Sequence, residues 1–321
     1  MQNIKLIKKI DLHRHIEGAI NPASLLTIYR KNFFKDKKTL KDFEKMLILE
    51  KGVGSLDKFI KKLGTPYLKE YVKTPDDLCF IFEKTIEDAH KDNINYLELR
   101  FTLSNFMKLD KTPDDLIKKI SERMAATSSK LGMKSGLILG IKRDDEISLS
   151  TEIIKIASRL YKDKNIVGID LAGNEHFFPN ELFIELGKKI KKENIPFVVH
   201  AGEVTNAQSV KTAVEKLGAN RIGHGTKAAE SLEVLELLAK KKIILEICPT
   251  SNIQTGAYET YEDIPIRKIL NYKVPVLICT DDPVTSGITL SREIETLIKK
   301  SIITLDEYKL MLKNAHNFYF S

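Results

Sequence analysis

Eight short runs of β-branched and other apolar residues alternate with longer amphipathic stretches along this chain of 321 residues. The runs are, in order, "KIDLH", "INYLELRF", "GLILGI", "IVGIDLAG", "IPFVVHAG", "ANRIGHG", "KIILEICP" and "VPVLICTDD". Helical patterns such as "DDLCFIFEKTIEDAHKDN" and "AAESLEVLELLAKKK" separate them. This rhythm predicts an α/β protein, and eight strand–helix units favour a closed (β/α)8 TIM-type barrel over an open doubly wound sheet. Catalytic groups of such a barrel gather at the C-terminal ends of its strands.

One segment departs from the alternation. Residues from about 21 to 75 contain helical pieces without an obvious strand, which predicts a helical lid insertion after the first strand. Within it Leu56, Phe59 and Leu63 lie at helical spacing, a pattern that fits simple helix packing as well as contact with a ligand. No linker or other repeat divides the chain, so we expect one domain over residues 1–321.

The charge does not indicate a nucleic-acid partner. The formal net charge is +8, but the lysines come in short pieces mixed with acids at helical spacing, which is typical of a solvated surface. No zinc finger, recognition helix or RNP-like pattern accompanies them. We therefore expect a small-molecule substrate and no nucleic-acid partner.

Cysteine usage and hydropathy bear on the compartment. The three cysteines have no CxxC spacing, so neither a disulfide framework nor a thiolate metal site is indicated. No segment reaches the roughly 18 unbroken apolar residues of a membrane helix, and the first residues lack a signal-peptide pattern. We expect no membrane association and a cytoplasmic location.

Four of the seven histidines, His13, His15, His200 and His224, lie where predicted strands end. His13 and His15 are two residues apart, so their side chains leave the strand on the same face and can hold one metal ion between them. A lone HxH motif is weak, because two hydrogen-bonded imidazoles are also common. The HxH motif therefore indicates a metal site only if other residues at the predicted strand ends can also bind metal.

Two further motifs strengthen the metal hypothesis. "VVHAGE" places His200 at the end of the fifth strand, and "ICTDDP" places Asp281 and Asp282 at the end of the eighth. Three imidazoles and a carboxylate suit zinc and leave room for a water whose pKa the metal lowers towards ~7. Adjacent strand residues face opposite ways, so one aspartate binds metal and the other is free to meet substrate.

Two acid–base groups complete the predicted site. Glu203, three residues after His200, lies beyond the metal ligands and can act as a general acid if burial raises its pKa. His224, between two glycines, is a further ligand or orients the attacking water; we favour the second role, since four ligands are already supplied.

The motifs "DLHRHIEGAI", "DLAGNE", "HAGE", "RIGHG", "CPTSNIQTGA" and "TDDP", in this order over nearly the whole chain, closely resemble the adenosine deaminase family of the amidohydrolase superfamily. The resemblance implies a barrel with one zinc ion that hydrolytically removes the 6-amino group of adenosine or 2′-deoxyadenosine. It makes His13, His15, His200 and Asp281 the zinc ligands, Glu203 the proton donor to purine N1, and His224 the group that assists water.

The same resemblance assigns groups around the purine and sugar. Gly173 matches the glycine whose backbone N–H meets N3, and Asp282 the aspartate that meets N7. Leu56, Phe59 and Leu63 match the apolar lid helix over the sugar.

One position departs from the adenosine-type pattern. Glu17 stands where adenosine deaminases usually carry an aspartate that contacts the ribose 5′-hydroxyl, and HxHxEG is more frequent in adenine deaminases. Adenine and 5′-modified adenosines such as methylthioadenosine therefore remain alternative substrates. A non-catalytic nucleoside-binding barrel is disfavoured by the intact set of ligands and acid.

Overall fold

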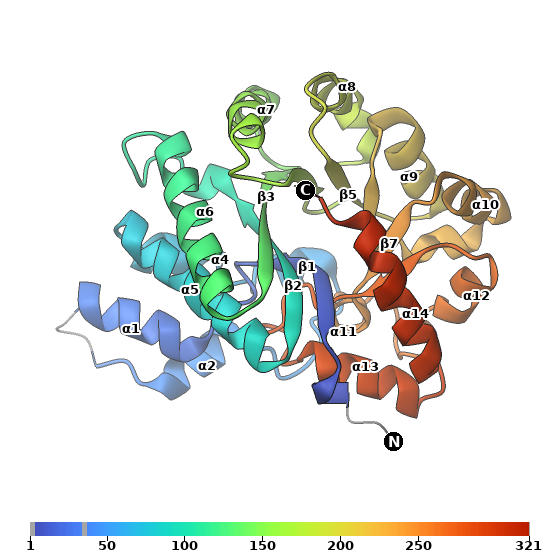
Figure 1. Cartoon of the computed structure of the whole chain (residues 1–321), viewed down its shortest axis with the longest axis horizontal. Helices are drawn as coiled ribbons and strands as arrows, with labels where there is room; N and C mark the ends of the chain where they lie inside the picture. The colour runs from blue at the N-terminus through green and yellow to red at the C-terminus, as the bar shows by residue number, and fades with distance from the viewer. Residues whose placement is uncertain (1–3, 34–36, 321) are drawn as a thin grey trace.

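The computed structural model describes residues 4–33 and 37–320. Eight parallel strands form one sheet in chain order, with helices around them (Figure 1). The strands are β1 (Lys9–His15), β2 (Ile94–Thr102), β3 (Lys134–Lys142), β4 (Gly168–Ala172), β5 (Phe197–Ala201), β6 (Arg221–His224), β7 (Ile244–Ile247) and β8 (Val276–Ile278). Every predicted strand is present in the predicted order, which confirms the (β/α)8 barrel.

The barrel closes beyond the end of β8 rather than within it. An isolated parallel bridge joins Arg14 of β1 to Asp281. The N–H of His15 donates to the carbonyl of Asp281 at 2.9 Å, and the N–H of Asp281 donates to the carbonyl of His13 at 2.8 Å. The closing contacts therefore involve the same residues that carry the predicted metal ligands.

The α-helices are α1 (Pro22–Asn32), α2 (Leu40–Leu47), α3 (Leu56–Ile60), α4 (Thr65–Tyr71), α5 (Pro75–Lys91), α6 (Pro113–Lys130), α7 (Ile147–Lys162), α8 (Ile184–Lys192), α9 (Ala207–Thr212), α10 (Leu232–Lys241), α11 (Pro249–Gln254), α12 (Ile266–Asn271), α13 (Leu290–Lys299) and α14 (Leu305–Ala315). Short helical turns are η1 (Ile4–Leu6), η2 (Leu103–Asn105), η3 (Asn180–Phe183), η4 (Ala213–Leu217), η5 (Thr226–Glu230) and η6 (His316–Phe318). Thr74 caps α5 and Thr112 caps α6 through their side chains, each followed by Pro at the first helical position, which explains why these helices begin where the sequence predicts.

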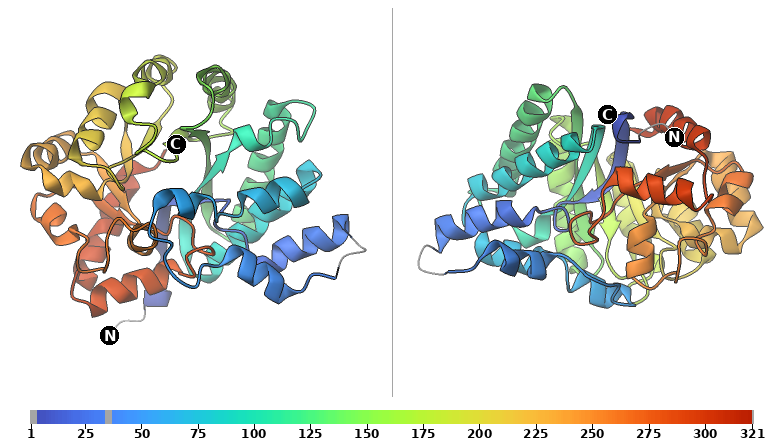
Figure 2. Two further views of the ribbon diagram at one scale, coloured as in Figure 1. Left: turned by 180° about the vertical axis from the view of Figure 1, so that it is seen from behind. Right: turned by 90° about the horizontal axis from the view of Figure 1, so that it is seen from below.

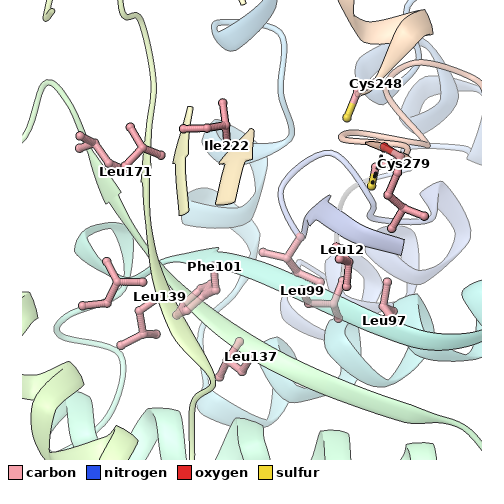
Figure 3. Packing of buried hydrophobic residues seen from close by; sticks show 14 of the residues in the cluster. Leu12, Leu97, Leu99, Phe101, Leu137, Leu139, Leu171, Ile222, Cys248 and Cys279 are labelled. Atoms are coloured by element: carbon pink, nitrogen blue, oxygen red, sulfur yellow. Dashed lines mark hydrogen bonds between the residues drawn. The ribbon is translucent and has the colours of Figure 1, made fainter. Parts of the chain in front are cut away.

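The apolar core lies between the strands and the helices. Figure 3 shows Leu97, Leu99 and Phe101 of β2 beside Leu137 and Leu139 of β3, all of them buried. These positions alternate along each strand, as expected for side chains that leave one face of a sheet.

The residues between them on β2 face the barrel interior and are polar. Tyr96, Glu98 and Arg100 are buried there among side chains from β4, β6 and β7. The interior of this barrel therefore holds charged groups where apolar layers usually lie.

Residues 21–75 are helical in the described part of the chain, where no strand interrupts them. In Figures 1 and 2, α1 and α2 (blue) lie at the edge of the molecule, outside the ring of strands. The helical nature of the segment agrees with prediction, while its role as a lid stays a prediction. Among the described residues no helix has the length and apolar character needed to span a membrane.

Candidate active site

A cavity of about 510 Å³ opens at the C-terminal ends of the strands. Every residue that the sequence analysis assigned to the site lines it except His13, which is fully buried just below. The predicted site residues that line the cavity are His15, Glu17, Leu56, Phe59, Leu63, Gly173, His200, Glu203, His224, Asp281 and Asp282. The fold thus brings together groups from β1, β4, β5, β6, the segment after β8 and residues 56–63.

Imidazole nitrogens and a carboxylate oxygen meet at very short range in this cavity. His15 Nε2 lies 3.2 Å from His200 Nε2, and Asp281 Oδ1 lies 3.4 Å from His15 Nε2 and 3.3 Å from His13 Nε2. Ligand atoms around a tetrahedral zinc at about 2.0–2.1 Å are about 3.3–3.4 Å apart. The separations therefore fit a zinc ion between these four side chains.

Carboxylates behind the histidines fix their ring orientation. Glu246 Oε2 lies 2.9 Å from His13 Nδ1, and Asp170 Oδ1 lies 3.0 Å from His200 Nδ1. A hydrogen on each Nδ1 leaves the Nε2 lone pair to bind a metal, which is the usual arrangement of metal-binding histidines. At His13, Nε2 also lies 3.0 Å from Nη1 of Arg100. Both carboxylates stay ionised: burial alone would raise their pKa values, but the guanidinium of Arg100 holds both low, that of Glu246 at about 2.

The protonation state of the histidines also favours metal binding, because a metal binds the neutral imidazole. Burial lowers the pKa of His15 and His224 well below the ordinary value, and it lowers that of His200 as well. Burial and the charge of Arg100 also lower the pKa of His13. Hydrogen bonds with Asp281 and Glu246 outweigh them, so the pKa of His13 is raised overall. Three of the four rings are thus neutral near pH 7.

His224 lies slightly farther from the short contacts. Its Nε2 is 3.7 Å from Asp281 Oδ2 and 3.7 Å from Glu203 Oε2, while its Nδ1 contacts Asn252 Nδ2 at 3.1 Å. His224 and Asp281 both have positive φ, 59° and 61°, which is uncommon for residues other than glycine and is found at functional sites. Two groups of side chains have ligand atoms close enough together to hold one metal ion. They are His224 with His13, His200 and Asp281, and His15 with Asp170 and His200.

Glu203 is held by a second glutamate through its backbone. Glu175 accepts hydrogen bonds from the N–H groups of Gly202 at 2.9 Å, Glu203 at 2.7 Å, Val204 at 2.9 Å and Thr205 at 3.2 Å. One buried carboxylate thereby fixes the loop that follows β5. Burial, together with the charges of Asp281 and Glu175, raises the pKa of Glu203 well above its ordinary value, which favours the protonated form of this acid.

Asp282 and Glu17 complete the carboxyl groups of the cavity. Burial and the neighbouring Asp281 raise the pKa of Asp282 well above normal, and its buried Oδ1 has no hydrogen-bond partner among the residues that the structure describes. A side chain at Gly18 would lie 1.9 Å from that oxygen, so the glycine is required by this close approach. Glu17 accepts from the N–H of Thr102 at 3.0 Å through Oε1, while its buried Oε2 has no hydrogen-bond partner in residues 4–33 and 37–320.

Comparison with known proteins agrees with this geometry. The family model described as adenosine deaminase matches residues 8–320. The chain belongs to the adenosine deaminase family. Proteins curated as adenosine deaminase from Clostridium kluyveri and Clostridium botulinum (strain Kyoto / Type A2) are 33% and 32% identical to it, over 97% and 98% of this chain and 89% and 93% of theirs.

Solved structures of similar fold include other purine enzymes. An adenine deaminase from Arthrobacter aurescens has a TM-score of 0.86 at 20% identity, covering 98% of this chain and 94% of its own. An amidohydrolase from Burkhoderia ambifaria with bound Zn has a TM-score of 0.86 at 22% identity, with coverages of 99% and 87%. Arabidopsis ADAL complexed with GMP has a TM-score of 0.84 at 24% identity, with coverages of 100% and 94%. These likenesses show the fold that the adenosine deaminase family shares with them.

Several residues of this adenosine deaminase family site were missed by sequence analysis. They are Asp170, Glu246, Arg100, Glu175, Ser251 and Asn252, which touch predicted site residues from behind. A signal existed for some: Glu246 in "KIILEICP" and Asp170 in "GIDLAG" are lone charges inside apolar strand runs. Ser251 and Asn252 gave none beyond the motif "CPTSNIQTGA".

Helix α11, which carries Ser251 and Asn252, is anchored by a buried acid on α13. Glu293 accepts from the N–H of Thr250 at 2.7 Å, and the hydroxyl of Tyr261 lies 3.2 Å from it. Burial raises the pKa of Glu293 to about 7, against the hydrogen bonds that favour its ionised form.

This pKa predicts a pH dependence of stability. In the unfolded chain Glu293 ionises near its ordinary pKa, so the folded state, which retains the proton, loses stability as pH rises from about 4.5 to 7, by about 3 kcal/mol in total. Glu293→Gln keeps the shape and cannot ionise. The Tm of the variant relative to wild type should therefore rise by several degrees between pH 5 and pH 8, and a constant difference would contradict the raised pKa.

Proposed function

We propose that this chain is a zinc-dependent adenosine deaminase that hydrolyses adenosine and 2′-deoxyadenosine to inosine, or 2′-deoxyinosine, and ammonia. The observation that carries the proposal is the set of three contacts of 3.2–3.4 Å among His13, His15, His200 and Asp281, beside the buried carboxyl of Glu203, whose pKa is raised by burial. Membership of the adenosine deaminase family and the names of the curated relatives support a hydrolytic deaminase.

His13, His15, His200 and Asp281 would hold one zinc ion. We prefer His15 to His224 as the fourth ligand, because His15 Nε2 lies 3.4 Å from the nearest Asp281 oxygen while His224 Nε2 lies 3.7 Å from its own. When bound, zinc lowers the pKa of a water molecule towards about 7 and so supplies a nucleophile at neutral pH. The zinc-containing structural neighbour supports the choice of metal.

The protein's own groups handle the protons. Glu203 holds a proton in its buried carboxyl and donates it to purine N1, which makes C6 more electrophilic. His224 Nε2 is 3.7 Å from both Glu203 and Asp281, so it orients the attacking water between them. The attacking water gives up two protons overall: one passes through the carboxylate of Glu203 to the amino group, which leaves as ammonia, and the other restores the proton of Glu203.

Other cavity residues orient the purine and exclude water. The carboxyl of Asp282, whose pKa is raised by burial and by Asp281, donates a hydrogen bond to N7, and the backbone N–H of Gly173 donates one to N3. Leu56, Phe59 and Leu63 line the cavity from residues 56–63, where we propose that they act as an apolar lid over the sugar.

We further propose that residues 1–321 form a single domain, that the substrate is a small molecule, and that the protein works in the reducing cytoplasm, where its three buried cysteines stay free.

The experiment that tests this function is ammonia release by the zinc-loaded protein with adenosine, 2′-deoxyadenosine, methylthioadenosine and adenine in parallel. We expect adenosine or 2′-deoxyadenosine to give the highest kcat/KM. Preference for adenine or methylthioadenosine would change the proposed substrate and leave the proposed hydrolytic deamination unchanged. No release from any of the four would overturn the proposed activity.

Glu17 bears on the choice between adenosine and the alternative substrates, adenine and 5′-modified adenosines, because it lines the cavity and its Oε2 has no hydrogen-bond partner within the described part of the chain. If this carboxyl contacts the ribose 5′-hydroxyl, Glu17→Ala should lower kcat/KM for adenosine by about 10- to 100-fold more than for 5′-deoxyadenosine, the effect of one hydrogen bond to a charged group. Both substrates are measured on the same variant, so any general loss of folding cancels. An unchanged ratio would remove Glu17 from sugar recognition.

A further inference from the structure

Buried charges of alternating sign run down the barrel interior below the metal-binding histidines. Their order is Asp170, Arg100, Glu246, Arg221 and Glu98, and all five residues are at most 1% exposed. Arg100 pairs with both Asp170 and Glu246, and Arg221 pairs with both Glu246 and Glu98. We call these five residues the charged row.

The upper end of the charged row touches the site directly. Asp170 and Glu246 are the carboxylates that orient His200 and His13. Glu246 is shared: its Oε2 faces His13 Nδ1 at 2.9 Å, and its Oε1 lies 2.8 Å from Arg221 Nε. The orientation of His13 therefore depends on the position of Glu246, which Arg100 contacts through Oε2 and Arg221 through an ion pair at Oε1.

The lower end of the row is held by residues 318–320. The carbonyl of Phe318 accepts from Arg221 at 2.9 Å, and the guanidinium of Arg221 lies 3.7 Å from the centre of the Phe320 ring. The N–H of Phe320 donates to Glu98 at 3.3 Å. This segment closes the bottom of the barrel, since a side chain at Gly168 would lie 2.7 Å from the Phe320 ring.

Tyr319 adds a further anchor. Its ring stacks on Tyr96 at 3.6 Å between centroids, and the hydroxyl of Tyr96 donates to Glu98 at 2.9 Å. Residues 318–320 thus make contact with Arg221, Glu98 and Tyr96 at once. Planar guanidinium groups with several fixed partners have little freedom to turn, so Arg221 is well placed to transmit position.

We propose that Arg221 and residues 318–320 are positioning elements of the metal site, at the opposite end of the barrel from the cavity. They hold Glu246, and Glu246 holds the ring of His13 in the orientation that presents Nε2 to zinc. The inference rests on the proposed zinc site. Substitutions at the barrel bottom should therefore weaken zinc binding although they touch neither zinc nor substrate.

The test measures zinc affinity by competition with a chromophoric chelator, together with the visible spectrum of the Co²⁺-substituted protein. Arg221→Gln should raise the zinc dissociation constant by about 10- to 100-fold, as loss of a partner behind a ligand usually does. Phe320→Leu, which removes the ring over the guanidinium, should raise it roughly 3- to 10-fold by weakening the hold on Arg221. Both should change the Co²⁺ spectrum, which reports ligand geometry.

Ile138→Val serves as the matched control. Ile138 packs with Phe320 and is the strand neighbour of Arg100, but its apolar side chain forms no hydrogen bond or ion pair with the charged row, so Ile138→Val should lower Tm and leave zinc affinity within about twofold. If Arg221→Gln does not fold, Arg221→Lys keeps the charge without the planar fork and should give an intermediate loss of affinity.

The outcomes separate the two proposals. Zinc affinity within twofold of wild type in both Arg221→Gln and Phe320→Leu, with Tm lowered as in the control, would overturn the positioning role. A wild-type protein that binds no zinc would instead overturn the proposed metal site. Weakened zinc binding in the Arg221 and Phe320 variants but not in the control would establish the connection.

Discussion

Glu203→Gln should lower kcat for adenosine by about 10²- to 10⁴-fold while zinc content and Tm stay close to wild type. Glutamine has the same shape and cannot transfer a proton, so the change removes the general acid alone. The environment is built for this role, since burial and the charges of Asp281 and Glu175 keep the carboxyl protonated. Steady-state ammonia release and zinc analysis on the same preparation check the result.

A chemically matched control is Glu193→Gln. Glu193 hydrogen-bonds the hydroxyl of Ser158 on the outside of the barrel, far from the cavity lining, and should leave kcat unchanged. Turnover near the wild-type rate in Glu203→Gln would exclude Glu203 as the proton donor and direct attention to His224.

Asp281→Asn should lower zinc affinity more than 100-fold and reduce activity accordingly, because it removes the one negatively charged ligand. Removal of a partner behind a ligand already costs 10- to 100-fold, so loss of a ligand charge costs more. Asparagine tolerates the left-handed backbone, so the positive φ of 61° at this position adds no new strain. Zinc content after dialysis, and ammonia release with and without added zinc, measure the effect.

Ser251→Ala provides the graded comparison. It removes the hydrogen bond of 2.6 Å from the serine hydroxyl to Asp281 Oδ2 and leaves the carboxylate in place. Excess zinc should restore Ser251→Ala and should not restore Asp281→Asn at the same concentration. Equal recovery of the two variants would show that Asp281 is not a ligand.

The barrel and the face of the site could be predicted from sequence because both depend on local pattern. Apolar runs that end in His13, His200, His224 and Asp281 locate the strand ends, and parallel strands in a barrel bring those ends to one rim. Glu203 follows from its spacing to His200.

The support behind the ligands could not be predicted in the same way. Glu98 and Arg100 alternate with apolar residues on β2, a pattern that fits either a solvent-facing side or a polar interior. Only the closed barrel shows that Arg221 and Glu246, more than 100 residues away, lie between them. Glu175 likewise shows no partner until the loop after β5 folds over it.

The charged row also constrains how this protein can change over evolutionary time. Replacing Arg100 or Arg221 removes the arginine partner of an end carboxylate, Asp170 or Glu98, and breaking a buried pair in this way costs about 3–5 kcal/mol, whereas replacing a complete pair with apolar residues of similar volume is often neutral. Viable routes to a different interior therefore pass through coordinated changes at two or more strands. We therefore expect these five positions to change together during evolution, whereas an exposed lysine can be replaced without a matching change elsewhere.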